Sequence, residues 1–364
     1  MSVCECASDG FCQRYRREMR GRFRELCRGI NVDLGTAAAF REQWAREAGT
    51  VTPVKAGAAN NLVLRTEQAP GDALVMTAAI YSLHRANPGK FKTAVDTPYR
   101  EVFENNPDVV PIGELHDASD LQMHYPAIHQ SNERGIHFMQ GCCEFLQEAL
   151  NVPVPLATNK PMLYFSSEPI PPSRPYWLIC SGIKRDFTNK RWGHARFQEV
   201  VDRLEGRVRF VQVGAVGAAH DHKKLDGVDD MLGKTTLREL FELVRSAQGV
   251  LCGVSLLMHV ASALDKPAVV IAGGREPVPW NAYPLQHYLH TVGMFPCCAT
   301  GACGRSRTVP IGDNVALDKD PCEFPVCEDE TIPLCMISLT PAQVAKKIGA
   351  IASGRGLRHD TVSV

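Results

Sequence analysis

Asp72 and Lys190 are the residues in this sequence best placed to handle a proton and a charged leaving group. Asp72 follows an apolar run at an expected strand-to-helix turn, where a carboxylate facing a cleft can act as a general base. An ordinary helix N-cap is the alternative interpretation. Lys190 lies in a loop after a second apolar run and could neutralise a departing phosphate. A solvated loop lysine is the alternative there, and Arg191 or Lys184 could take its place.

The segment 250–274 adds a predicted anion site. It reads as an apolar strand, a loop, a short helix with His259 near its start, and a second apolar strand. Backbone N–H groups at a helix start lack intrahelical partners and attract anions, and open α/β sheets bind ligands at the carboxyl ends of their strands. We therefore predict that Ser255, Met258 and His259 contact a phosphate or nucleotide-sugar. A histidine buried only for packing is the alternative.

Small and polar residues near Lys190 and near the end of the segment 250–274 complete the predicted phosphate and sugar contacts. Ser181 and Gly182 could approach phosphate through backbone N–H groups, and Thr188 lies in the same loop as the lysine. Gly274 and Glu276 follow the last buried strand and could contact ribose or sugar hydroxyls. A surface loop is the alternative interpretation of these two positions.

The stretch 124–132 is unusually polar for a loop, with two histidines and an amide, and could line a cleft. No spacing rule supports this interpretation beyond the residue types. The residues that we place on this side of the cleft are Gly71, His124, His129 and Asn132.

The chain has fourteen cysteines, and those in the aperiodic segment 291–338 predict a structural metal site. An irregular segment of this length needs a source of order, which tetrahedral thiolate coordination to iron or zinc would supply. Buried or free thiols are the alternative. The preferred ligands are Cys298, Cys303, Cys322 and Cys335, with Cys297 and Cys327 as replacements. A second group could bind metal separately or join the first: Cys4, Cys6, Cys12 and Cys27.

The bulk composition excludes several classes of protein. The 364 residues suffice for two domains, and the formal net charge of zero gives no reason to expect nucleic acid as a partner. The sequence has no apolar run of about 18 residues, and its first residues lack the order of a secretory signal. We therefore expect a cytoplasmic protein. An arginine-rich amphipathic helix within 14–28 is either a solvated face or a peripheral membrane contact.

Apolar periodicity predicts two βαβ series separated by a proline-rich stretch at 166–175. In the first series we expect strands at 62–64, 91–95 and 109–112, and helices at 73–83, 98–104 and 137–150. In the second we expect strands at 176–180, 208–213, 250–252 and 268–272, and helices at 195–204 and 236–246. A closing helix at 340–353 begins with a capping box between Thr340 and Gln343.

Several stretches, in order, together resemble the glycosyltransferase family nine enzymes, the ADP-heptose-dependent lipopolysaccharide heptosyltransferases. They are 70–80 followed by 104–109, then 190–192, 232–240 and 258–264. The resemblance implies an α/β fold of the GT-B type, with two Rossmann-like domains facing across a cleft. It also implies inverting sugar transfer from a nucleotide-sugar without a catalytic metal, with Asp72 as the base and Lys190 on the donor.

The resemblance also orders the predicted domains. They are a Cys- and Arg-rich helical extension (1–49), an acceptor-side domain (50–166), a linker (167–175), a donor-side domain (176–290), a Cys-rich insertion (291–338), and a closing helix and tail (339–364). The insertion looks like that of the autotransporter heptosyltransferases, whose cysteines hold iron. The acceptor could be a glycan, a lipid-linked glycan or a protein.

The sequence departs from the family at one point. Val254 stands where the family usually has an acidic residue, and Leu256 stands where it usually has glycine. This departure leaves two other functions open: a non-catalytic binding protein that keeps the GT-B fold, and a nucleotide-sugar epimerase.

Overall fold

The computed structural model describes residues 60–313 and 315–354, which all belong to one compact unit of the chain, 35–364. The predicted extension at 1–49, with its four cysteines and its basic helix, lies outside the described residues. No helix in the described part of the chain is both long enough and apolar enough to cross a membrane.

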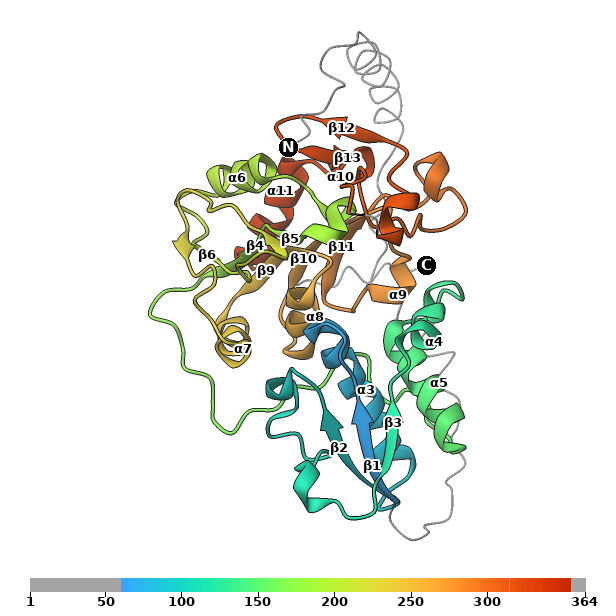
Figure 1. The fold of residues 1–364 in the computed structure, drawn as a ribbon. Helices are drawn as coiled ribbons and strands as arrows, with labels where there is room; N and C mark the ends of the chain where they lie inside the picture. The colour runs from blue at the N-terminus through green and yellow to red at the C-terminus, as the bar shows by residue number, and fades with distance from the viewer. Residues whose placement is uncertain (1–59, 314, 355–364) are drawn as a thin grey trace, which may run out of the picture. The chain divides into compact units, whose positions relative to one another are not determined.

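A three-stranded parallel sheet organises the first half of the described chain (Figure 1). Its strand order is β2-β1-β3, and the strands are β1 (Asn60–Arg65), β2 (Phe91–Asp96) and β3 (Ser119–Gln122). Its two long helices, α3 (Pro70–Ala86) and α5 (Phe138–Leu150), pack against each other. Short helical turns connect the elements: η2 (Arg100–Phe103), η3 (Ile112–Glu114), α4 (Tyr125–His129) and η4 (Gln130–Asn132).

Two expectations for this half were wrong. The strand expected at 109–112 is reduced to one bridge between Thr93 and Val109, and the third strand is β3 instead. The residues of β3 are mostly polar and exposed because the strand lies at the sheet edge, so they carry no apolar run. The polar stretch 124–132 forms α4 and η4 rather than a loop.

A six-stranded sheet, parallel throughout, organises the second half. The order is β11-β10-β9-β4-β6-β8. The strands are β4 (Trp177–Cys180), β6 (Phe210–Gln212), β8 (Asp229–Asp230), β9 (Gly249–Gly253), β10 (Ala268–Gly273) and β11 (Gln286–His290). The chain runs outward from β4 through β6 to β8 and then returns to the other side at β9. The carboxyl ends of β4 and β9 therefore form a topological switch point, where such sheets bind ligands.

Helices and short elements complete this half. The helices are α6 (His194–Arg203), α7 (Leu237–Ser246), α8 (Leu256–Ala263), α9 (Val278–Asn281), α10 (Leu334–Ile337) and α11 (Pro341–Ala352). The predicted capping box at the start of α11 is present: the side chains of Thr340 and Gln343 each accept a hydrogen bond from the other's backbone N–H. An antiparallel pair joins β5 (Ile183–Lys184) to β7 (His220–Asp221), and η5 (Arg185–Lys190) follows β5.

The segment 291–338 is largely irregular, as its lack of periodicity predicts. Its regular parts are η6 (Pro296–Cys298), η7 (Ala316–Lys319), the antiparallel pair β12 (Pro325–Cys327) and β13 (Thr331–Pro333), and α10.

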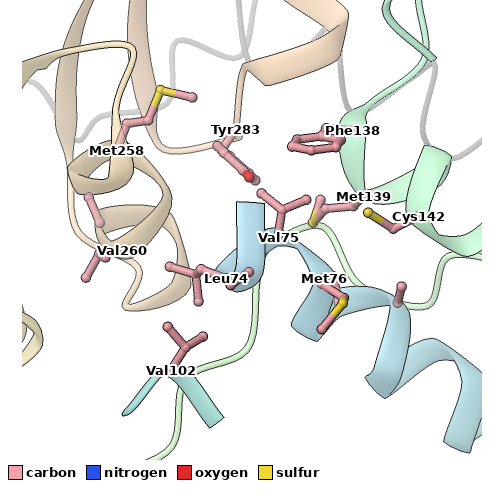
Figure 2. Close-up of a cluster of buried hydrophobic side chains, with 14 of the residues drawn as sticks. Leu74, Val75, Met76, Val102, Phe138, Met139, Cys142, Met258, Val260 and Tyr283 are labelled. Carbon is pink, nitrogen blue, oxygen red and sulfur yellow. The ribbon is translucent and has the colours of Figure 1, made fainter. Parts of the chain in front are cut away.

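Helix α3 connects the two sheets through packing. Its residues 73–80 are all buried, which is typical of a helix enclosed on every side. Figure 2 shows Val75 and Met76 of α3 in one apolar cluster with Phe138 of α5 and Val260 of α8. At its start, a Cβ added to Gly71 would lie 3.3 Å from Cδ2 of His259. The first turns of α3 and α8 therefore touch, and their surroundings form the candidate site.

Candidate functional site

Asp72 lies in the first turn of α3, at the carboxyl end of β1. The N-cap position belongs to Ala69, whose methyl group cannot accept a hydrogen bond, so the N-cap interpretation of Asp72 was wrong. Burial raises the pKa of the Asp72 carboxyl from 3.8 to about 6, against the opposing effects of Lys190 and Lys184. A buried carboxyl with such a pKa can accept a proton near neutral pH.

Three charged residues from the second half pair with one another, and we call Lys190, Arg275 and Glu276 the charged cluster. The charges of Lys190 and Glu276 act on Asp72. The Lys190 Nζ atom lies 2.8 Å from Oε1 of Glu276, and Arg275 pairs with the same oxygen. Asn281 donates a hydrogen bond of 2.6 Å to the other oxygen of Glu276. Burial raises the pKa of Glu276, but Lys190 and Arg275 outweigh it and hold that pKa at about 2. The Glu276 carboxylate is therefore ionised and both of its oxygens are engaged.

This pairing gives Glu276 a definite role in holding Lys190 and Arg275. Its side chain is only 5% exposed, so it offers little surface to a sugar or ribose. The Lys190 Nζ atom also lies 3.4 Å from the carbonyl oxygen of Val254, in the loop before α8. An ammonium group has three N–H donors, so one donor is left after these two contacts.

His259 lies inside the molecule with its ring against Tyr283. The Nδ1 atom of His259 and the Tyr283 hydroxyl are 2.8 Å apart, and the two rings are perpendicular. Burial lowers the pKa of His259 to about 3, so the ring is neutral at physiological pH. The ring of His137 also packs against Tyr283, with centroids 4.7 Å apart. His259 therefore lies beside the candidate site as an uncharged hydrogen-bonding group.

The loops at the switch point come close together around His222, a residue that the sequence patterns did not single out. A Cβ added to Gly182, after β4, or to Gly214, after β6, would lie 2.2 Å from an atom of the His222 ring. The Ser181 hydroxyl accepts a 3.0 Å hydrogen bond from Gln212. The Ser255 hydroxyl, at the start of α8, is buried, and its hydrogen bond with the Cys252 thiol lowers the pKa of that thiol against the larger effect of burial.

The residues predicted for the other side of the cleft divide into two groups. The His129 ring packs against Trp280, with centroids 4.7 Å apart, and its pKa is lowered by burial and by Arg275. Asn132 lies 3.4 Å from Nδ1 of His129. His124, by contrast, is exposed before α4. The structure therefore brings His129 and Asn132 close to the charged cluster and leaves His124 at the surface.

Other predicted donor contacts serve the packing of the protein. The Met258 side chain is completely buried in the cluster of Figure 2, so it presents no surface to a ligand. The Thr188 hydroxyl accepts a 2.9 Å hydrogen bond from the backbone of Thr308. The carbonyl of Gly274 accepts one of 3.0 Å from the backbone of Cys303. The loop that contains Thr188 and the loop that contains Gly274 are thus both hydrogen-bonded to the Cys-rich segment.

Five of the six cysteines proposed as metal ligands gather in one region: Cys297, Cys298, Cys303, Cys322 and Cys335. The pKa of Cys335 is raised to about 12, chiefly by burial and in smaller part by the thiols of Cys322, Cys303 and Cys297. Cys327 ends β12. Within 60–313 and 315–354, no three histidine, cysteine, aspartate or glutamate side chains are arranged to hold a metal ion. Thiol groups are suitable ligands for iron or zinc, but the thiols of the described residues are not arranged as a formed metal site.

A small pocket lies beside Asp72, at the carboxyl ends of β1 and β3. Its lining residues are Thr66, Gln68, Asp72, Met76, Met123, Tyr125, Ile128, Phe138 and Cys142. We call this space the apolar pocket. Tyr125 and Ile128 belong to the stretch 124–132, which was predicted to line a cleft. Apart from that stretch and Asp72, the sequence patterns pointed to none of these residues.

Comparison with known proteins assigns the family. The sequence model of glycosyltransferase family 9 (heptosyltransferase) matches residues 116–298. The chain belongs to this family. Lipopolysaccharide heptosyltransferase 2 of Salmonella typhimurium is 30% identical over 118 residues, which are 29% of this chain and 32% of that protein. The chain thus spans about a third of the length of that curated relative.

Solved structures show the same GT-B fold, with parallel sheets in an α/β arrangement. The iron-containing dodecameric glycosyltransferase TibC from enterotoxigenic E. coli has a TM-score of 0.57 and 17% identity, over 83% of this chain and 78% of that one. A family 9 glycosyltransferase from Veillonella parvula has a TM-score of 0.57 and 13% identity, over 84% and 100% of the two chains. ADP-heptose heptosyltransferase II of E. coli has a TM-score of 0.50 and 15% identity, over 81% and 99%.

Proposed function

We propose that this chain is an inverting glycosyltransferase that moves heptose or a related sugar from a nucleotide-diphosphate sugar to an acceptor hydroxyl. The observation that carries this proposal is the Asp72 carboxyl, with its pKa raised to about 6, within electrostatic reach of Lys190. Membership of the heptosyltransferase family supports the reaction class. One solved relative, TibC, was crystallised in complex with ADP-D-β-D-heptose.

In the proposed step the acceptor oxygen attacks the anomeric carbon while the bond from that carbon to the diphosphate oxygen breaks. Asp72 takes the hydroxyl proton, and the electron pair of the broken bond stays on the diphosphate. The remaining N–H donor of Lys190 and the backbone N–H groups at the start of α8 stabilise that negative charge. We assign this step no catalytic metal, because these groups supply the positive potential that the leaving group needs.

The test is Asp72→Asn, assayed by release of nucleotide diphosphate from the donor and by product analysis. Loss of a general base lowers turnover by about 10²–10⁴-fold. Asp202→Asn, an exposed position on α6, is the matched control and retains turnover. Unchanged turnover in Asp72→Asn rules out the base role.

The same assay separates the two alternative functions. A parent protein that binds nucleotide diphosphates in a thermal-shift screen but turns over no donor is a binding protein. A parent protein that converts the donor sugar to its epimer without any acceptor is an epimerase. Val254, which replaces the family's usual acidic residue, is the observation that keeps the binding protein under consideration.

We also propose that the gathered thiols bind structural iron or zinc through Cys298, Cys303, Cys322 and Cys335. Burial raises the pKa of Cys303, Cys322 and Cys335, and a bound cation would offset the cost of ionising such thiols. The solved relative TibC is an iron-containing glycosyltransferase, which supports this proposal. Elemental analysis of the purified protein tests it: Cys335→Ser loses the metal, and Cys143→Ser, buried elsewhere, keeps it. Absence of metal from the parent protein contradicts the proposal.

Two further parts of the proposal concern the location of the protein. We propose a cytoplasmic protein that contacts the membrane surface through the basic residues within 14–28. Vesicles containing anionic lipid are the probe: the full chain co-sediments with them at low salt and is released at high salt. Vesicle binding that does not change with salt concentration contradicts an electrostatic contact.

A further inference from the structure

Trp280 belongs to the second half of the described chain, but its side chain packs against the first half. Its ring lies 4.7 Å from the ring of His129 and 5.0 Å from that of Phe138, measured between centroids. Its Nε1 atom donates a 2.8 Å hydrogen bond to the hydroxyl of Ser131. The residue is only 4% exposed. These contacts dock the short helix α9 onto α4, η4 and α5.

Four rings stabilise this contact, and we call Tyr125, His129, Phe138 and Trp280 the aromatic box. Tyr125 lies 5.1 Å from His129 and 5.9 Å from Phe138, so each ring of the box contacts two others. The pairs are tilted or edge to face, and edge-to-face pairs are a favourable arrangement of aromatic rings. Burial and the positive charge of Arg275 lower the pKa of His129, so its ring is uncharged at neutral pH.

A short and stiff segment connects Trp280 to Glu276. Three residues separate them, and two of these are Pro277 and Pro279, whose rings restrict the backbone angle φ. Asn281, the residue after Trp280, donates a 2.6 Å hydrogen bond to Oε2 of Glu276. A displacement of the Trp280 ring would therefore also displace the Glu276 carboxylate.

Glu276 in turn fixes the position of Lys190, whose Nζ atom lies 2.8 Å from Oε1 of Glu276. Lys190 is the residue that we assign to the departing diphosphate, and its charge lowers the pKa of Asp72. The contacts thus form a path from Trp280 through Asn281 and Glu276 to this lysine. The path starts where α9 meets the first half, and it ends at a charge that acts on the carboxyl of the first half.

We propose that Trp280 is a positioning residue for sugar transfer, because its docking in the aromatic box holds Glu276 and Lys190 where the leaving diphosphate needs a positive charge. The inference rests on the proposed function, since it concerns the same site. Trp280 takes no part in the bond changes and acts only through Glu276 and Lys190. The arrangement of the charged cluster therefore depends on contact between the two halves of the described chain.

Substitution of Trp280 in the full chain is the first test, with kcat and KM for donor turnover as readouts. Trp280→Ala removes the ring, and we expect kcat per folded molecule to fall by about 10²-fold, because a misplacement of about 1 Å has this effect on a reaction. Trp280→Phe keeps a ring in the box and recovers most of the loss. Phe91→Ala removes another buried ring, in β2 outside the box, and retains kcat. Equal losses of kcat in Trp280→Ala and Phe91→Ala reflect lost packing alone and overturn the proposal.

Asn281→Ala interrupts the same path and leaves the aromatic box intact, so it keeps the test decisive if Trp280→Ala fails to fold. We expect kcat to fall about tenfold, because a hydrogen bond to a charged carboxylate is lost. Trp280→Phe and Asn281→Ala both act through Glu276, so the double variant loses less than the product of the two single losses. Losses that multiply show independent effects and overturn the proposal, as does an unchanged kcat in Asn281→Ala.

The pKa of Asp72 gives a readout that needs no turnover, so failure of the proposed function is recognised separately. Carbon-13 NMR of aspartate-labelled protein follows the Asp72 carboxyl, with Asp72→Asn identifying its signal. The titratable groups that act with Asp72 are Lys190, Lys184, Glu276, Tyr125, Cys142 and Tyr283.

Asn281→Ala loosens the cluster while the box still shields Asp72 from water. Among the cluster residues Lys190 has the larger effect on Asp72, so its displacement raises the pKa above the parent value of about 6. A raised pKa in Asn281→Ala supports the positioning role even if the parent protein turns over no donor, in which case the proposed function alone fails. An unchanged or lowered pKa contradicts the positioning role.

Discussion

Two sets of residues meet at Asp72, one from each half of the described chain, and they differ sharply in charge. The first is the lining of the apolar pocket, in which Asp72 is the charged member of the described lining. The second is the charged cluster, whose lysine, arginine and glutamate pair with one another inside the protein. The contrast teaches that the first half contributes one carboxyl to this region, while the second half contributes paired charges of both signs. Asp72 belongs to both environments and connects them.

The two sides also differ in what stabilises them. The apolar pocket is built on the buried cluster of α3 and α5, so burial of apolar area stabilises it. The charged cluster carries a desolvation cost that only complete pairing offsets. Changes of pH and single substitutions therefore affect turnover and the free energy of unfolding differently on the two sides.

The pH dependence of turnover gives the largest expected effect. Because the pKa of Asp72 is raised to about 6, its basic form is lost as the pH falls through that value. We expect kcat/KM to fall about tenfold per pH unit below pH 6 and to level off above it. The raised pKa also means that the ionised carboxyl destabilises the fold above pH 6, so Asp72→Asn melts no lower than the parent at pH 8. A profile that is flat between pH 5 and pH 7 contradicts Asp72 as the base.

Removal of Glu276 tests the charged side. Glu276→Ala leaves Lys190 and Arg275 buried without their shared partner, at a cost of about 3–5 kcal/mol in the free energy of unfolding. Urea unfolding measures the loss. Glu199→Ala, which removes an exposed partner of Arg203 on α6, costs at most about 0.5 kcal/mol and serves as the control. If the two variants lose the same free energy of unfolding, water reaches the charged cluster in the folded protein.

The close approach of the switch-point loops gives an intermediate effect. Gly182→Ala places a Cβ 2.2 Å from the His222 ring and costs about 1–3 kcal/mol through overpacking. His222→Ala in the same chain removes the clash, so the double variant recovers most of this loss. If the losses of the two single variants simply add, the two residues are not in contact.

The hydrogen bond between Tyr283 and His259 gives the smallest effect. Tyr283→Phe keeps the ring that packs against His137 and removes the hydroxyl group 2.8 Å from Nδ1 of His259. We expect a loss of about 1 kcal/mol in the free energy of unfolding, because one buried imidazole nitrogen loses its partner. If Tyr283→Phe costs more free energy in turnover than in unfolding, the hydroxyl also orients His259 toward the substrate.

The sequence predicted the elements whose apolar pattern is local. Helices α5, α7 and α11 and strands β4, β9 and β10 lie within a few residues of their expected positions. Strand β3 was missed because an exposed edge strand needs no apolar residues. Asp72 was found from its place before a helix, although that same place also suggested the N-cap role that the structure excludes.

Long-range pairings set the limits of what the sequence could predict. Lys190 and Glu276 were both candidate site residues, but their separation of 86 positions gave no sign that one neutralises the other. Met258 looked like a site residue because of its neighbours, while tertiary packing places it in the core. The apolar pocket joins residues from α3, α4 and α5 and from the ends of β1 and β3, so no single segment of the sequence contains its pattern.

The Cys-rich segment is joined to the loops of the charged cluster largely through main-chain atoms. The N–H groups of Cys303 and Gly304 donate to the carbonyls of Gly274 and Arg275, and the N–H of Asn189 donates to the carbonyl of Ser306. Such bonds do not depend on side-chain identity, although the buried Arg307 also holds Asp186 of η5 through its side chain. Gly304 is an exception, because its φ of 68° disfavours any side chain. A deletion in the Cys-rich segment is more damaging than a substitution, because it removes the N–H donors themselves.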